Sequence, residues 1–237
     1  PLSVLLGKPP RMQRDAQRLS FAQNPFSGAE LKVEDAAERV LTLPTVGDKT
    51  FLITIGDRTV GGLSARDQMV GPCQVPVGDA AVTAAGFESH AGEAMAIGER
   101  TPIALLDPSA ASRMAAGEAL TNIVSAPIVN TRQVKFSANW MAPAGHPGED
   151  AGLHDAVRTL GMDFCPALGI AVPVGKDSLS MRTVWTEKGE EHSVTAPISL
   201  IISAFAPVTD IRRALTPELQ KTESPSRLLL IDLGEGR

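Results

Sequence analysis

The sequence predicts an α+β domain of layered α/β type, with one main sheet and helices packed on one of its faces. Apolar strand-like runs alternate with helix-like segments from about residue 102 onward, as in layered domains. The 237 residues suffice for one large domain or two small ones. Hydrophobic residues make up 43% of the chain and charged residues 21%, so a sizeable core can be buried.

The opening residues are expected to form a tail and connector. The run 2–7 has the composition of a strand end, and the apolar spacing of 33–44 predicts a short helix stopped by its final proline. A boundary is expected near residue 45. β-Branched and apolar residues then predict a strand over 50–55, which Gly56 ends.

The later elements are expected in alternating order. We expect strands over 102–107, 134–142, 170–175 and 197–208, a hairpin over 181–196, and helices over 108–126 and 148–161. Ser109 is a candidate N-cap of the first helix, and Gly161 is the expected end of the second.

Charge, hydropathy and cysteine usage exclude several classes of function. The net charge is −5 and the Lys and Arg residues are scattered, which argues against nucleic-acid binding. The apolar stretch 198–206 is about half the length that a membrane-spanning helix needs, and it contains two serines. Cys73 and Cys165 show neither metal-ligand spacing nor a disulfide framework, which predicts a cytoplasmic protein.

A first candidate site combines Asp79, Glu118 and Asn122. Glu118 and Asn122 are four residues apart in the expected helix, so their side chains share one face. Two carboxylates and an amide offer the oxygen ligands that Mg²⁺ prefers, with water and nucleotide phosphates completing the shell. The alternative is an exposed helix face and an unrelated aspartate at a strand end.

Two further segments have features of phosphate sites. The run GKDSLS over 175–180 follows an apolar strand and can present backbone amides, an ammonium and a hydroxyl, although it lacks a Walker A pattern. The Gly- and Pro-rich loop 56–79 carries Arg66, Asp67 and Gln68, a possible polar cluster over phosphates. An ordinary strand edge and a surface loop with a local Arg66–Asp67 pairing are the alternatives.

These segments together resemble the large single-chain form of phosphoribosylformylglycinamidine synthase, the glutamine amidotransferase of purine biosynthesis. The resemblance is carried by VGGLSARDQMVGPCQVPV, GEALTN, SANWMA, GHPGEDAGL and PVGKDSLSM, and it extends from about residue 5 to 234. It implies an internal fragment of the synthetase region that resembles an A-type subdomain of aminoimidazole ribonucleotide synthetase, with a mixed sheet. Residues 1–44 would end the preceding B-type subdomain, 45–222 would form the second A-type subdomain, and 223–237 would begin the next B-type subdomain.

The resemblance also implies roles for particular residues. Mg²⁺ on a bound ATP or ADP would be coordinated by Asp79, Glu118 and Asn122. The nucleotide would be lined by Gly78, and the substrate would be contacted by Gly175 and Ser178. Small-type relatives carry a metal-binding Asn where this chain has Lys176, so no metal role is transferred to that lysine.

The parent reaction of this family converts formylglycinamide ribonucleotide and glutamine to the amidine at the expense of ATP. The resemblance implies that this segment carries an auxiliary ADP site, lines the synthetase cleft and is inactive alone. Expected partners are the nucleotide, the ribonucleotide substrate and the remaining synthetase and glutaminase domains, with no nucleic acid and no membrane. Two other classes stay open, namely another ATP-dependent kinase of the synthetase superfamily and a structural module with a decayed nucleotide site.

Overall fold

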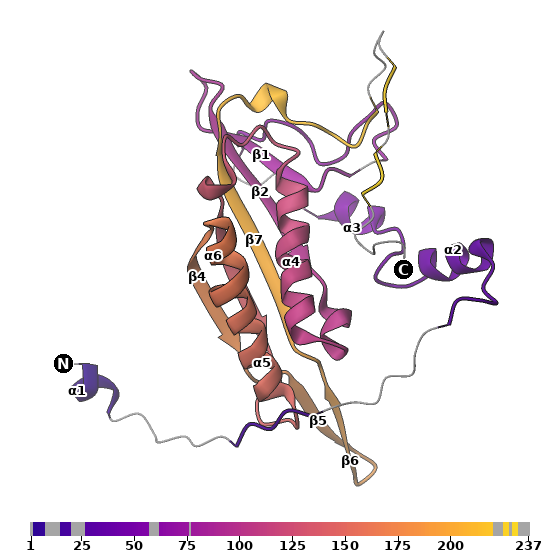
Figure 1. The fold of residues 1–237 in the computed structure, drawn as a ribbon, viewed down its shortest axis with the longest axis vertical. Helices are drawn as coiled ribbons and strands as arrows, with labels where there is room; N and C mark the ends of the chain where they lie inside the picture. Colours follow the sequence, from indigo (N-terminus) through magenta and orange to yellow (C-terminus); the bar gives the residue numbers. More distant parts are fainter. Residues whose placement is uncertain are drawn as a thin grey trace.

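A five-stranded sheet dominates the computed structural model of the chain, in which residues 2–7, 15–19, 27–56, 62–75, 77–219, 225–227 and 229–231 are described (Figure 1). The strands of this sheet are β1 (Ala80–Ala84), β2 (Gly92–Glu99), β3 (Lys135–Met141), β4 (Ala171–Ser178) and β7 (Ser199–Val208). Helices cover one of its faces, which confirms the predicted layered α/β class.

The sheet is mixed, with the strand order β1-β2-β7-β3-β4. β3 and β4 are parallel, and every other neighbouring pair is antiparallel. The C-terminal ends of β2, β3 and β4 therefore lie at the same end of the sheet. One row contains Gly98, near the C-terminal end of β2, and then Ile202, Ala138 and Gly175 near the middle of their strands, each paired with the next. Residues far apart in the sequence thus become neighbours there.

The helix layer consists mainly of α4 (Pro108–Ile123), α5 (Glu149–Arg158) and the short α6 (Cys165–Leu168). Burial alternates along β2, and its even-numbered residues face the helices. Ala115 and Ala119 of α4 are fully buried, and their small side chains let the helix lie close to β2. Phe136, Leu160 and Ile202 fill the rest of the core.

Several predicted elements are confirmed. The helix α2 (Val33–Leu41) lies in the N-terminal region, and β3, β4 and β7 form where strands were expected. The predicted hairpin is formed by β5 (Arg182–Glu187) and β6 (Glu190–Thr195), which make a separate two-stranded sheet. Across this hairpin the ring of Trp185 stacks on that of His192, with 5.5 Å between centroids.

Three predicted strands are wrong, because the segments are helical. They are α1 (Leu2–Leu6), α3 (Thr50–Ile55) and the 3₁₀ turn η1 (Thr101–Leu105). At α3 a local turn before the helix outweighs β propensity, since the carboxylate of Asp48 accepts hydrogen bonds from the backbone N–H and hydroxyl of Thr50, whereas the N-cap Lys49 makes no side-chain cap. At η1 the chain turns from the end of β2 into α4, which leaves no room for a strand.

Two helix ends also differ from expectation. Asp107, rather than Ser109, caps α4 by accepting a hydrogen bond from the N–H of Ala110 at 3.0 Å. The second predicted helix continues past Gly161 through a π-helical segment, Thr159–Phe164, into α6. It ends at Gly169, whose φ of +68° is the left-handed conformation typical of a helix C-terminus.

The ends of the predicted domains lie partly outside the described residues. Within 223–237 the structure describes 225–227 and 229–231, and these form no strand. Short 3₁₀ turns, η2 (Thr131–Gln133) and η4 (Ile211–Arg213), flank the sheet. Among the described helices, none has the length and apolar character required to span a bilayer.

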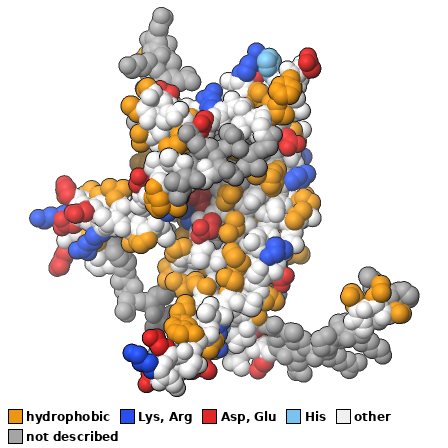
Figure 2. Space-filling model, turned by 180° about the vertical axis from the view of Figure 1, so that it is seen from behind, with side chains coloured by type: hydrophobic (Ala, Val, Ile, Leu, Met, Phe, Trp, Pro, Cys, Tyr) orange, Lys and Arg blue, Asp and Glu red, His pale blue; other side chains and the backbone are white. Residues whose placement is uncertain are grey.

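The face of the sheet opposite the helices is open. Figure 2, seen from behind, shows hydrophobic side chains gathered on this side of the molecule, with acidic side chains between them. Strand register places Met95, Ile97, Val174 and Phe205 on this face, and each is between 40% and 58% exposed. A sheet face with this many exposed apolar side chains is typical of a surface that another domain or chain covers.

Candidate metal and nucleotide site

Close contact between β2 and α4 creates the candidate site. A Cβ added to Gly98 would lie 2.0 Å from the carbonyl oxygen of Ala115 and 2.5 Å from the backbone nitrogen of Ala119. Only glycine permits such an approach, because any side chain would collide with helix backbone. The last residues of β2 consequently lie within hydrogen-bonding reach of side chains from α4.

Two of the three predicted metal ligands form hydrogen bonds from α4 to β2 at this contact. The carboxylate Oε2 of Glu118 accepts a hydrogen bond from the N–H of Glu99 at 2.8 Å. The side-chain amide of Asn122 donates to the carbonyl oxygen of Ile97 at 3.1 Å. The structure therefore brings Glu118 and Asn122 to the same end of β2, and both are half-buried.

The third predicted ligand, Asp79, approaches this end of the sheet from β1. It directly precedes Ala80, which pairs with Ala96 of β2. Its side chain is exposed, and no hydrogen bond joins it to Glu118 or Asn122 in the described part of the chain. Its assignment as a ligand stays a prediction.

The donor set has the chemistry that a hard cation requires. Because Asn122 donates through its amide nitrogen, its carbonyl oxygen is left available as a ligand. Within the described residues there is no preformed group of three or more acidic, His or Cys side chains that could hold a metal ion. Two carboxylates and one amide are nevertheless sufficient for Mg²⁺, which usually keeps several waters and takes phosphate oxygens as ligands.

Arg100 is a member of this site that the sequence patterns did not indicate. Its guanidinium Nη2 lies 2.9 Å from Oε1 of Glu118, so both carboxylate oxygens of Glu118 have partners. Gly98 and Glu99 end a strand that was also missed in the sequence, and Arg100 directly follows it. The signals that could have revealed the strand were the alternation of Gly or Ala with larger residues in GEAMAIGE and the glycine within it.

The predicted nucleotide residue Gly78 lies in the polar loop before Asp79. Its N–H donates to the carbonyl of Gln68 at 2.7 Å, and Met69 forms a bridge with Val77, so the loop folds back on itself. Residues 57–61 and 76 of this loop lie outside the described residues. The proposed contacts of the loop with phosphates are untested and stay predictions.

The predicted substrate residues lie on β4, at the same end of the sheet. Gly175 belongs to the same row as Gly98. Three strand spacings, or roughly 14 Å, separate these two glycines. Gly175 and Ser178 point to opposite faces of β4, because they are three residues apart in a strand. The hydroxyl of Ser178 accepts a hydrogen bond from Nζ of Lys176 at 2.8 Å, and Nζ is 3.5 Å from Oδ1 of Asn139.

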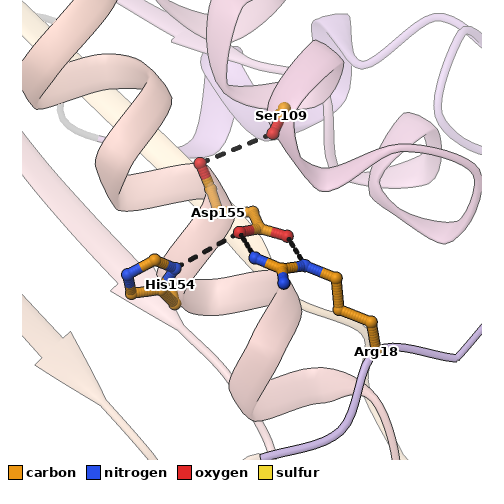
Figure 3. Close-up of polar contacts among 4 residues, drawn as sticks. All are labelled: Arg18, Ser109, His154 and Asp155. Atoms are coloured by element: carbon orange, nitrogen blue, oxygen red, sulfur yellow. Dashed lines mark hydrogen bonds and ion pairs between the residues drawn. The ribbon is translucent and has the colours of Figure 1, made fainter.

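A second polar cluster lies at α5, away from these residues (Figure 3). Arg18 forms two hydrogen bonds with the carboxylate of Asp155, at 2.6 and 2.8 Å, and His154 lies 3.2 Å from the same carboxylate. The hydrogen bond from Arg18 is the main reason that the pKa of Asp155 is lowered to about 2. A hollow of about 420 Å³ lies beside the cluster, and none of the predicted site residues lines it.

Solved structures of Thermotoga maritima proteins share this fold. "Structure of PurLQS from Thermotoga maritima" matches over 87% of the chain, at 17% identity and a TM-score of 0.53. "T. maritima PurL complexed with ATP" matches at 17% identity, with 87% coverage and a TM-score of 0.50. "T. maritima PurL complexed with FGAR" matches at 18% identity, with 91% coverage and a TM-score of 0.50. The chain covers 29% of the length of each of these three.

A family model gives the more specific result. The model described as "FGAR-AT PurM_N-like domain" matches residues 48–207, which include β1 to β4, most of β7, and the residues Gly78, Asp79, Glu118, Asn122, Gly175 and Ser178. This match covers well over half of the chain and contains the whole candidate site. The chain therefore belongs to the FGAR-AT PurM_N-like domain family.

Proposed function

We propose that this chain is a nucleotide-binding subdomain of the synthetase region of a formylglycinamide ribonucleotide amidotransferase, a cytoplasmic ATP-dependent ligase of purine biosynthesis. The observation that carries the proposal is the convergence of Glu118 and Asn122 on the end of β2, within the region that the family model matches. Structures of the related T. maritima protein with ATP, ADP and FGAR support small-molecule binding by this fold.

In this proposal Mg²⁺ would be held by Asp79, Glu118 and Asn122. When bound, the cation would neutralise charge on the phosphates of an adenine nucleotide, and Gly78 would let the backbone approach that nucleotide closely. The site would hold ADP in an auxiliary role. Turnover would require domains outside this chain, among them a glutaminase domain that supplies ammonia.

Gly175 and Ser178 would contact the ribonucleotide substrate in the C-terminal half of β4, Gly175 through its backbone and Ser178 through its hydroxyl. Their position at the same end of the sheet as the metal residues supports one cleft that extends across several strands. Other synthetase domains and a glutaminase domain would complete that cleft and cover the open sheet face.

Calorimetry of the full-length amidotransferase with Mg·ADP tests this function. We expect Glu118→Ala and Asn122→Ala each to weaken binding of Mg·ADP at least tenfold, because each removes an oxygen ligand. Thr121→Ala is a matched control, since its exposed hydroxyl bonds only to the helix carbonyl of Glu118. Undiminished Mg·ADP binding in both variants would refute the metal assignment.

One observation favours a second candidate function, a structural module without a cation. The ion pair between Arg100 and Glu118 already neutralises the charge of the carboxylate. If that role is permanent, the unmodified protein will show no Mg·ADP binding that depends on Glu118 or Asn122. The same calorimetry therefore separates the two functions.

A further inference from the structure

The two oxygens of Glu118 are held by partners of very different kinds. Oε2 accepts from the backbone N–H of Glu99, which is fixed in place because it ends a paired strand. Oε1 lies 2.9 Å from Nη2 of Arg100. The partner of Oε2 is a backbone group of the sheet, whereas the partner of Oε1 is a long, flexible side chain.

The Arg100 side chain is exposed enough to move away from Glu118. It is 47% exposed, whereas the side chain of Glu118 is 24% exposed. Arg100 lies between the end of β2 and the turn η1, and its backbone carbonyl accepts from the N–H of Ile103. The backbone is thus held by the turn, while the partly exposed guanidinium reaches Glu118.

A cation and this guanidinium would compete for the negative charge of the same carboxylate. A divalent ion held by Glu118 would come close to the guanidinium nitrogen that now contacts Oε1. Two positive groups so close together repel each other strongly, even with partial solvent screening. The side-chain carbonyl oxygen of Asn122 would be available to the cation whether or not Arg100 contacts Glu118, because the amide nitrogen of Asn122 donates to the carbonyl of Ile97.

We propose that Arg100 is an internal competitor of the divalent cation, which holds Glu118 when the site is empty and must leave before the ion can bind. This inference rests on the proposed function, since it requires Glu118 to be a metal ligand. It makes Arg100 a residue that sets the affinity of the site. It also explains how a half-buried carboxylate is neutralised in the absence of metal.

The test is direct binding of Mn²⁺ without nucleotide, followed by the electron paramagnetic resonance signal of the free ion, in the full-length amidotransferase. Glu118→Gln identifies which Mn²⁺ site belongs to this carboxylate. At that site we expect Arg100→Gln to bind Mn²⁺ about tenfold more tightly than the unmodified protein, because a like charge has been removed from a partly exposed site. Arg100→Lys retains the charge, and we expect it to stay within about threefold of the unmodified protein.

Arg113→Gln is the matched control. Arg113 is an exposed residue of α4, so this variant changes the net charge equally without touching Glu118. Tighter Mn²⁺ binding in Arg100→Gln but not in Arg113→Gln supports competition at Glu118. Equal Mn²⁺ affinity in Arg100→Gln and the unmodified protein, with the site still lost in Glu118→Gln, would overturn the competitor role alone. If Glu118→Gln retains every Mn²⁺ site, the proposed metal site and the competitor role both fail.

Discussion

Gly98 of β2 lies directly against Ala115 of α4, so close that a Cβ on the strand residue would stand 2.0 Å from the helix carbonyl oxygen. Both Ala115 and its neighbour Ala119 are fully buried at this contact. The contact fixes the distance between strand and helix, and the hydrogen bonds of Glu118 and Asn122 to β2 depend on that distance.

Gly98→Ala is therefore expected to destabilise the fold. The added methyl group would meet backbone atoms that cannot rotate away, and overpacking of this kind typically costs about 1–3 kcal/mol. Urea unfolding measures the change. Gly117→Ala is the control on α4, since a Cβ there meets nothing within 4 Å, and it should stabilise the helix by up to about 1 kcal/mol. Equal unfolding midpoints for the two variants would contradict the close contact.

Gly175→Ala should affect substrate binding without affecting the fold. A Cβ at this position would lie 3.7 Å from Cζ3 of Trp140, an ordinary contact distance, so the free energy of unfolding should change by less than about 0.5 kcal/mol. If the substrate approaches the backbone here, its affinity falls. Calorimetry with formylglycinamide ribonucleotide measures this, with Gly86→Ala as a control in open space. Unaltered affinity would remove Gly175 from the substrate site.

The open sheet face should cause the isolated chain to self-associate. Phe205 is 40% exposed on this face and pairs with Met95, so Phe205→Glu places a charge in the centre of the apolar surface. We expect this variant to lower the apparent mass in sedimentation experiments. Val184→Glu is the control, because Val184 is 48% exposed on the separate hairpin. A similar decrease in both variants would indicate a non-specific effect of charge.

The contact between Arg18 and Asp155 should respond to acid only at low pH. The hydrogen bond from Arg18 lowers the pKa of Asp155 to about 2, against about 3.9 for an unperturbed aspartate. The contribution of the Arg18–Asp155 contact to the free energy of unfolding is therefore complete above about pH 4 and is lost as the pH falls towards 2. Because 69% of the Arg18 side chain is exposed, salt should weaken the contact.

Carboxyl NMR titration of Asp155 tests this prediction. We expect a midpoint near 2 in the unmodified protein, and a higher midpoint in Arg18→Gln. His154→Gln should raise the midpoint less, since the hydrogen bond from His154 contributes less to the lowered pKa. A midpoint that Arg18→Gln leaves unaltered would exclude Arg18 as its main cause.

Periodicity in the sequence predicted the parts of the fold that are buried on one side and regular in spacing, such as α4, β3 and β7. It failed where a local contact decided the outcome, as at α3, where the turn between Asp48 and Thr50 precedes a helix in a β-prone run. For the candidate site, helical spacing placed Glu118 and Asn122 on one face. Arg100 could not be found this way, because its contact depends on how closely β2 approaches α4.

The order of strands in the sheet has a consequence for biosynthesis. β7 pairs with both β2 and β3, yet it is the last strand of the sheet to leave the ribosome. Until then the hairpin of β1 and β2 and the parallel pair of β3 and β4 each present an unpaired edge to other chains. Translation of residues 199–208 joins the two halves and closes those edges, so a stall just upstream would leave a nascent product prone to aggregation.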